Sequence, residues 1–165
     1  MQHQAVLLLG SNEGDSMKFL RFAMSEIEIW VGKIVTSSSI YRSKAWGNTQ
    51  QADFLNSVHH VQTNLDPIKL LKTILTIEQS AGRIRYEKWG PRCLDIDILY
   101  YDDIVYKDDQ LLIPHAGICN RRFTLVPLCE LIPEHIHPVT GKTNQWMLDH
   151  CTDTCAVLKL NPEHQ

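Results

Sequence analysis

Two amphipathic helical segments, each enclosed between strand-like segments, limit the folds open to this chain more than any other feature. The first follows a possible cap at Ser16 and has its apolar residues at helical spacing. These are Leu20, Met24, Ile27 and Val31. The second begins at Asp66-Pro67, where a cap acceptor precedes a proline that needs no backbone donor, and it ends at Gly82. Both patterns predict helices that bury one side against a sheet.

Four segments have the apolar, β-branched character of strands: 4–9, 34–42, 54–65 and 94–101. Together with the two helices they give the order β-α-β-β-α-β, which is the split-βαβ arrangement. We therefore expect an α+β fold with a ferredoxin-like antiparallel sheet, in which the last strand lies beside the first. The final third of the chain is expected to be an extension of helices and loops, with a helix near 123–132. One domain, 1–165, is the simplest organisation.

The bulk composition is that of an ordinary globular protein. The chain has 165 residues, 44% of them hydrophobic, and a formal net charge of −3, which does not favour a polyanion-binding protein. Its five cysteines are odd in number and form no C-x-x-C, which favours a reducing compartment. The N-terminus lacks the basic region of a signal peptide, and no stretch approaches the roughly 20 apolar residues of a membrane span. We expect a cytoplasmic monomer with no membrane or nucleic-acid partner.

Two aspartates interrupt the otherwise apolar strand 94–101. Because strand side chains alternate, Asp95 and Asp97 point to one face, while Leu94, Ile96 and Ile98 point to the other. The apolar character of the strand predicts a central place in the sheet. If it pairs antiparallel with 4–9, the two carboxylates lie near the turn that follows that strand.

Paired carboxylates on a strand have two interpretations. They can be solvated charges on an exposed edge, which protect against aggregation. They can also hold Mg²⁺ with a polyphosphate, since Mg²⁺ is typically bound by one or two carboxylates and phosphate oxygens. The preceding loop favours the second interpretation, because arginine forks match phosphate geometry. Its basic residues are Arg83, Arg85, Lys88 and Arg92. The chain contains neither a Walker A nor a G-x-G-x-x-G motif, so the phosphate site must be built differently.

The sequence resembles the 6-hydroxymethyl-7,8-dihydropterin pyrophosphokinases, which are enzymes of folate biosynthesis. The resemblance extends over nearly the whole chain, and KWGPRCLDIDIL at 88–99 is its most specific part. Other matching segments are LLLGSN (7–12), SSIYRSKAWG (38–47), DFLNSV (53–58), IEQSAGRIR (77–85), IPH (113–115) and NRRFTLVPLCELIPE (120–134). It implies a ferredoxin-like fold and the transfer of pyrophosphate from ATP to the hydroxymethyl group of the pterin.

The resemblance also implies roles on the phosphate side of the site. Asp95 and Asp97 match the ligands of two Mg²⁺ ions, and Asp95 also faces the pterin. Arg83 and Arg92 match the arginines that hold the transferring phosphates. Further positions on the ATP side are Arg85, Trp89, Ile98, His115 and Arg121. Glu78 is expected either to contact the nucleotide or to pair with an arginine.

On the pterin side, the resemblance implies that Phe54 and Phe123 enclose the ring. Asn56 lies two residues from Phe54 on the same strand face and would hydrogen-bond the edge of the ring. A flat heterocycle is well bound by aromatic faces with amide groups at its rim. The loop that reads the pterin would contain Ser43, Lys44 and Trp46.

Four positions depart from residues that some family members carry near the nucleotide: Leu75, Gln110, Leu112 and Ala116. The triphosphate site is therefore better supported than the adenine and ribose contacts. Two other functions remain open. An RNA-binding ferredoxin-like module is disfavoured by the negative net charge and by the missing aromatic run. A catalytically silent nucleotide or pterin sensor would be separated from an enzyme by a turnover assay.

Overall fold

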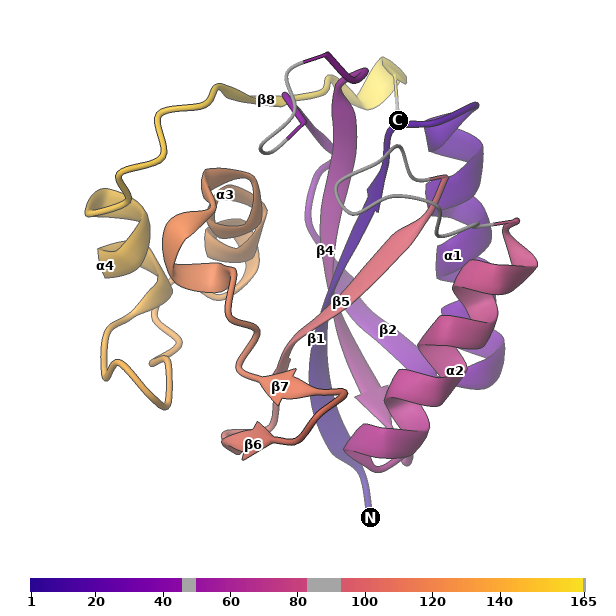
Figure 1. Ribbon diagram of the computed structural model, residues 1–165, viewed down its shortest axis with the longest axis vertical. Coiled ribbons are helices and arrows are strands. Elements are labelled where there is room, and N and C mark those ends of the chain that lie inside the picture. Colours follow the sequence, from indigo (N-terminus) through magenta and orange to yellow (C-terminus); the bar gives the residue numbers. More distant parts are fainter. Residues whose placement is uncertain (46–49, 83–92, 165) are drawn as a thin grey trace.

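The computed structural model describes residues 1–45, 50–82 and 93–164, which form a six-stranded sheet with helices on both faces (Figure 1). The sheet strands are β1 (His3–Ser11), β2 (Gly32–Ser37), β3 (Tyr41–Ser43), β4 (Phe54–Thr63), β5 (Asp95–Tyr101) and β8 (Val157–Lys159). The helices are α1 (Ser16–Trp30), α2 (Pro67–Ser80), α3 (Arg122–Leu131) and α4 (Asn144–Asp149). A small hairpin of β6 (Tyr106–Lys107) and β7 (Leu112–Ile113) follows β5. Short 3-10 turns occur at Ile118–Asn120 and Pro162–His164.

The sheet runs in the order β5-β1-β4-β3-β8, and β2 pairs with the other half of the same edge of β4. Every pairing in it is antiparallel. Helices α1 and α2 cover one face, and α3 and α4 cover the other (Figure 1). The expected antiparallel sheet is therefore confirmed. The expected placement of the strand at 94–101 beside the strand at 4–9 is confirmed as well.

Each face of the sheet has its own hydrophobic core. The larger core joins the sheet to α1 and α2 through residues such as Leu7, Leu20 and Ile74. The smaller core joins it to α3 and α4 through Leu8, Leu125 and other residues. Strand β1 contributes to both cores because its successive side chains point to opposite faces.

The expectation of a central position for 94–101 is wrong, because β5 lies at an edge of the sheet. Its apolar sequence has another cause: both of its faces are covered by cores. Its backbone also finds partners beyond the sheet. Glu78 of α2 accepts a hydrogen bond from the Ile96 N–H at 2.8 Å, and the His115 N–H donates to the Leu99 carbonyl at 3.0 Å. These contacts replace part of the ladder that a further strand would supply.

The expected strand 34–42 is two strands, β2 and β3, with a break at residues 38–40. Ser38 still exchanges bonds with Val58, but one is made by its side chain: its N–H donates to the Val58 carbonyl and its hydroxyl accepts from the Val58 N–H, both at 2.8 Å. The next backbone N–H, that of Ser39, bonds to Glu130 rather than to the sheet. Side-chain bonds of this kind compete with the ladder and end a strand.

The helix boundaries follow local capping. Asp66 caps α2 through Lys69 N at 2.9 Å, with Pro67 as the first helical residue, as the sequence predicts. Helix α1 is capped by Asp15 rather than by Ser16, which is its first helical residue. Helix α3 confirms the expected helix near 123–132. Helix α4 and strand β8 are too short to give a periodic signal in the sequence, and they were not expected.

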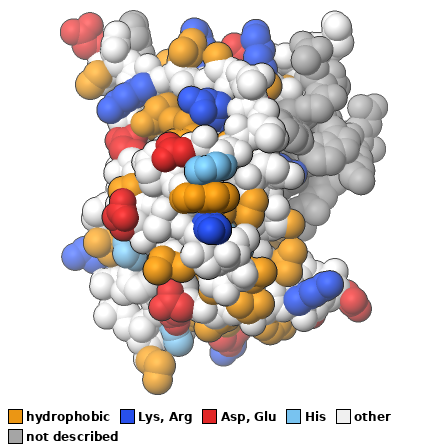
Figure 2. Space-filling view, turned by 90° about the vertical axis from the view of Figure 1, so that its left-hand side faces the viewer, with side chains coloured by type: hydrophobic (Ala, Val, Ile, Leu, Met, Phe, Trp, Pro, Cys, Tyr) orange, Lys and Arg blue, Asp and Glu red, His pale blue; other side chains and the backbone are white. Residues whose placement is uncertain are grey.

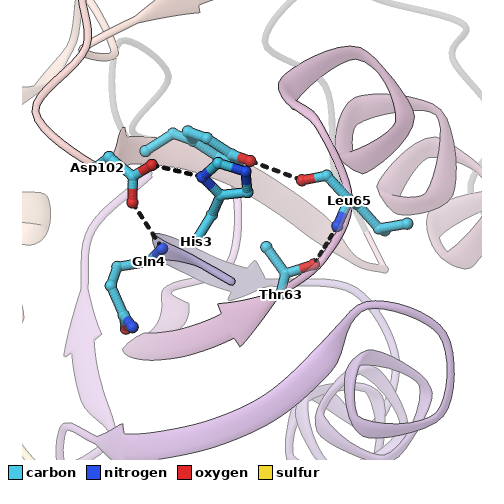
Figure 3. A network of polar contacts seen from close by, with 6 residues as sticks. His3, Gln4, Thr63, Leu65 and Asp102 are labelled. Carbon is cyan, nitrogen blue, oxygen red and sulfur yellow. Dashed lines mark hydrogen bonds and ion pairs between the residues drawn. The ribbon is translucent and has the colours of Figure 1, made fainter. Parts of the chain in front are cut away.

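At the far end of the sheet a polar network ties β1 to the residue after β5 (Figure 3). Asp102 accepts a hydrogen bond from the Gln4 N–H at 2.8 Å and contacts His3 Nδ1 at 2.7 Å. Beside it, the Thr63 hydroxyl accepts from the Leu65 N–H and donates to the Val31 carbonyl. The Tyr101 hydroxyl of β5 also donates to the Leu65 carbonyl at 2.7 Å, so that β1, β4 and β5 are linked at the end of the sheet away from Asp95.

The outer surface of α3 and α4 mixes hydrophobic, acidic and basic side chains (Figure 2). Exposed hydrophobic residues here include Ile136, Val139 and Trp146. The Trp146 ring is not isolated, because it stacks on His150 at 3.8 Å and the Lys142 ammonium lies 4.7 Å from its centre. Among the described residues, no helix is both long and apolar enough to cross a membrane.

A buried histidine makes the stability of this fold depend on pH. His59 in β4 is 1% exposed, and its two ring nitrogens contact the hydroxyls of Ser37 and Ser57 at 2.8 and 2.7 Å. Burial lowers the pKa of His59 from 6.5 to about 4. The unfolded chain therefore binds a proton at this site between pH 6.5 and 4, whereas the folded chain does not.

We predict that stability falls as the pH drops from 6.5 to 4, with His59 contributing roughly 3 kcal/mol to the loss. Urea unfolding across this range measures the slope, and His59→Gln should reduce it. An NMR titration that gave His59 a pKa near 6.5 in the folded protein would contradict this prediction.

Candidate active site

The two aspartates lie at the start of β5, where β5 pairs with the end of β1. Asp95 is opposite Gly10 and Asp97 is opposite Leu8. Both are half-buried and point to the α3 side of the sheet, whereas Ile96 and Ile98 belong to the core on the α1 and α2 side. The predicted division of the strand into a carboxylate face and an apolar face is confirmed.

On the other side of Gly10 lies Asn56, so that Asn56, Gly10 and Asp95 form one row across β4, β1 and β5. Asn56 is 3% exposed, and its side-chain amide donates to the Ser43 hydroxyl at 3.0 Å. A Cβ atom at Gly10 would lie 2.9 Å from Asn56 Oδ1. Only glycine therefore leaves the Asn56 amide in this position.

The two phenylalanines come from opposite layers. Phe54 is two residues from Asn56 on the same face of β4, opposite Ser43 of β3. Phe123 is in the first turn of α3, packed against the core that covers this face. Arg121 lies beside Phe123, with its guanidinium carbon 6.0 Å from the centre of the ring. The sheet and α3 thus each contribute one aromatic ring to this region.

His115 joins the carboxylates from the segment after β7. Its Nε2 lies 3.6 Å from Asp97 Oδ1, and its Nδ1 accepts a hydrogen bond from the Gly117 N–H at 2.9 Å. The neutral ring therefore carries its proton on Nε2, the atom that faces Asp97. Burial lowers the pKa of His115, the positive charge of Arg121 lowers it further, and Asp95 opposes both effects. The imidazole is neutral near pH 7 and presents a donor to the carboxylate side of the site.

Three of the expected positions have mainly structural surroundings. Glu78 is 3% exposed and holds the backbone between the two aspartates through its bond to the Ile96 N–H. The Ile98 side chain is buried in the core opposite Leu7. Lys44 is exposed and forms an ion pair with Asp53 at 3.0 Å.

Five expected site residues lie outside the described residues: Trp46, Arg83, Arg85, Trp89 and Arg92. The structure brings together the expected site residues that lie in or around the row of Asn56, Gly10 and Asp95. These are Ser43, Phe54, Asn56, Asp95, Asp97, His115, Arg121 and Phe123.

The role of Gly10 was not predicted. The strand expected at 4–9 stops before this glycine, whereas β1 continues to Ser11 and Gly10 pairs on both sides. A glycine inside an apolar strand is a known signal of close approach by a neighbouring group. That signal was present in LLLGSN, and the neighbouring group is Asn56.

Solved structures share this fold. The chain matches Plasmodium falciparum HPPK-DHPS with a TM-score of 0.75 and 19% sequence identity, over 91% of this chain and 43% of that one. A second HPPK-DHPS structure, crystallised with substrates, matches with a TM-score of 0.73 over 90% of this chain and 43% of that one, at 18% identity. The chain therefore spans less than half the length of these larger proteins, and the likeness shows the fold alone.

Sequence comparisons define the family. Residues 6–133 match the model of 7,8-dihydro-6-hydroxymethylpterin-pyrophosphokinase (HPPK), and this chain belongs to that family. A 2-amino-4-hydroxy-6-hydroxymethyldihydropteridine pyrophosphokinase of Synechocystis is 40% identical over 161 residues, which cover 97% of this chain and 82% of the relative. A relative of the same name from Haemophilus influenzae is 37% identical over 163 residues, which cover 96% of this chain and 98% of the relative.

We predict that Gly10→Ala keeps the fold but weakens pterin binding about tenfold, because the new methyl group displaces the Asn56 amide. Fluorescence titration with the dihydropterin measures this affinity. Gly141→Ala is the control: Gly141 has a φ of 68°, and its Cβ would have no neighbour within 4 Å, so only stability should change. Unchanged pterin affinity in Gly10→Ala would show that Asn56 does not bind the ring.

Proposed function

We propose that this chain transfers pyrophosphate from ATP to the hydroxymethyl group of 6-hydroxymethyl-7,8-dihydropterin, a step of folate biosynthesis. AMP and the pterin diphosphate are the products. Membership of the family supports this function, and the row Asn56-Gly10-Asp95 is the observation that carries it. Neighbouring strands lie about 4.8 Å apart, so the amide and the carboxylate are about 10 Å apart on one face. A pterin held at Asn56 would extend along this row toward Asp95.

The pterin would bind between the sheet and α3. We assign Phe54 and Phe123 to its two faces, since the rings come from opposite layers, and Asn56 to its hydrogen-bonding edge. The buried Asn56 amide is fixed by Ser43, so its orientation does not depend on the ligand. We extend the pterin-reading segment to Lys44 and Trp46.

The residues at the start of β5 fit magnesium. Asp95 and Asp97 offer oxygen donors from one face, and Mg²⁺ commonly combines one or two carboxylates with water and phosphate oxygens. Within 1–45, 50–82 and 93–164, no group of three or more His, Cys, Asp or Glu side chains is arranged to hold a metal. We propose that two ions bind here and that phosphate oxygens complete their coordination. When bound, Mg²⁺ neutralises the charge of the triphosphate.

The protein would act by alignment and charge. The pterin hydroxyl oxygen attacks the β-phosphorus, the bond from that phosphorus to the α–β bridging oxygen breaks, AMP leaves, and the hydroxyl proton is released. We assign Asp95 to orienting the hydroxyl. His115, Arg121, Arg83 and Arg92 would bind phosphate oxygens, where cationic and N–H groups stabilise the transferred charge. No side chain needs to form a covalent bond with the substrate.

Further ATP contacts are assigned to Arg85, Trp89 and Ile98, the last through its backbone since its side chain is buried. We assign Glu78 to holding the β5 backbone beside the nucleotide.

The strand order also supports a ferredoxin-like description of the sheet, with α3, α4 and β8 as additions. The five cysteines are free thiols, and we propose a cytoplasmic, single-domain enzyme.

The products distinguish this reaction from that of an ordinary kinase. Incubation with ATP, Mg²⁺ and the dihydropterin should give AMP and pterin diphosphate in equal amounts, as measured by chromatography. ADP with a pterin monophosphate would instead indicate attack at the γ-phosphorus and would refute the proposed reaction.

We predict that Asp97→Ala lowers turnover by on the order of 10²- to 10³-fold, because it removes a charge that binds metal and phosphate. Its thermal unfolding should stay close to that of the wild type, since the carboxylate is not part of a core. Asp109→Ala, at an exposed position in the β6–β7 hairpin, is the matched control and should be fully active. Near wild-type turnover of Asp97→Ala at ordinary Mg²⁺ concentrations would exclude Asp97 as a metal ligand.

A further inference from the structure

The carboxylate of Glu130, in the last turn of α3, clamps the segment between β2 and β3. The Ser39 N–H donates to Oε1 at 3.0 Å and to Oε2 at 3.2 Å, and the Ser39 hydroxyl donates to Oε1 at 2.9 Å. The Tyr41 hydroxyl donates to Oε2. Both oxygens of one side chain are thus held by two residues that are about 90 positions away in the sequence.

The position of this carboxylate is unfavourable for α3 alone. A negative charge near the C-terminal end of a helix opposes the helix dipole. Burial acts to raise the pKa of Glu130, but the hydrogen bonds from Tyr41 and Ser39 and the charge of Lys159 outweigh it and lower the pKa. The side chain therefore stays ionised at neutral pH, and its hydrogen-bond donors Ser39 and Tyr41 lie outside the helix.

The clamped segment leads directly into the pterin side of the site. Tyr41 is opposite Asn56 in the sheet, and Ser43 is opposite Phe54. The Asn56 amide in turn donates to Ser43. Any shift of β3 would therefore also move Asn56 and Phe54 of β4, the two residues of that strand that we assign to the pterin ring.

The other end of the clamp is the helix that carries Phe123. Phe123 and Glu130 are seven residues apart, or two helical turns, so they lie on the same face of α3 and about 10 Å apart along its axis. The opposite end of α3 is held separately, because Asp153 accepts a hydrogen bond from the Arg122 N–H at 2.9 Å. Glu130 thus fixes the end of the helix that Asp153 does not reach.

We propose that Glu130 is a positioning residue that sets the separation between α3 and β3, and thereby the gap between Phe54 and Phe123 into which the pterin fits. This inference rests on the proposed function, since it concerns the pterin side of that site. The proposal concerns the pterin side alone, because the hydrogen bonds of Glu130 within the described part of the chain go to Ser39 and Tyr41.

Separate titrations with each ligand test the clamp. Glu130→Ala should raise the dissociation constant of the dihydropterin about tenfold and leave that of a non-hydrolysable Mg·ATP analogue within about twofold. Glu130→Gln keeps an oxygen that accepts from Ser39 and should recover part of the affinity. Tyr41→Phe removes one donor and should give a smaller loss. The matched control is Glu28→Ala, an exposed glutamate of α1 on the opposite side of the sheet.

A general loss of stability would weaken both ligands together, so the ratio of the two effects separates positioning from folding. Equal changes for both ligands, or unchanged pterin affinity in Glu130→Ala, would overturn the inference. If Glu130→Ala does not fold, Tyr41→Phe and Ser39→Ala decide the question by the same ratio. A wild-type protein that forms AMP and pterin diphosphate while these variants keep full pterin affinity would refute the clamp but not the proposed function.

Discussion

The pairing of β1 with both β4 and β5 is the constraint on which the rest of this structure depends. It places Asn56 and Asp95 on either side of Gly10, so residues nearly 40 positions apart share one row of the sheet. Because side chains alternate along each strand, a slip of one residue in either pairing would turn the amide or the carboxylate to the opposite core. The register is therefore both a folding requirement and the geometry of the site.

The two cores stabilise different parts of the sheet. The core under α1 and α2 contains apolar side chains of β5, and α2 also binds that edge strand through the buried Glu78 carboxylate. The other face carries the functional groups near one end and a smaller core under α3 and α4 near its middle. Since α3 also carries Phe123 and Glu130, its docking on the sheet couples the packing of the smaller core to the shape of the site. The polar contacts of Asp102 hold the opposite end of the sheet (Figure 3).

Much of this arrangement follows from local patterns in the sequence. The Asp66-Pro67 start of α2 and the carboxylate face of β5 were predictable because capping and alternation depend on neighbouring residues. The edge position of β5 was not, because the sequence does not show that a glutamate of α2 and the backbone of His115 replace the missing strand. The division into β2 and β3 was also missed, since it depends on Glu130, about 90 residues away. Phe54, Phe123 and His115 themselves come from three separate segments, and only the fold brings them together.

We propose that one row of the sheet holds the pterin beside the metal-bound triphosphate. Mn²⁺ in place of Mg²⁺ tests it directly, because a paramagnetic ion broadens the NMR signals of nearby protons. With Mn²⁺, an ATP analogue and the dihydropterin bound together, the proposed site would hold the ring within about 10 Å of Asp95. The pterin protons should therefore relax much faster than with Mg²⁺, and Asp97→Ala should abolish the effect. Pterin signals that stay sharp while Mn²⁺ and the analogue are bound would contradict a shared site.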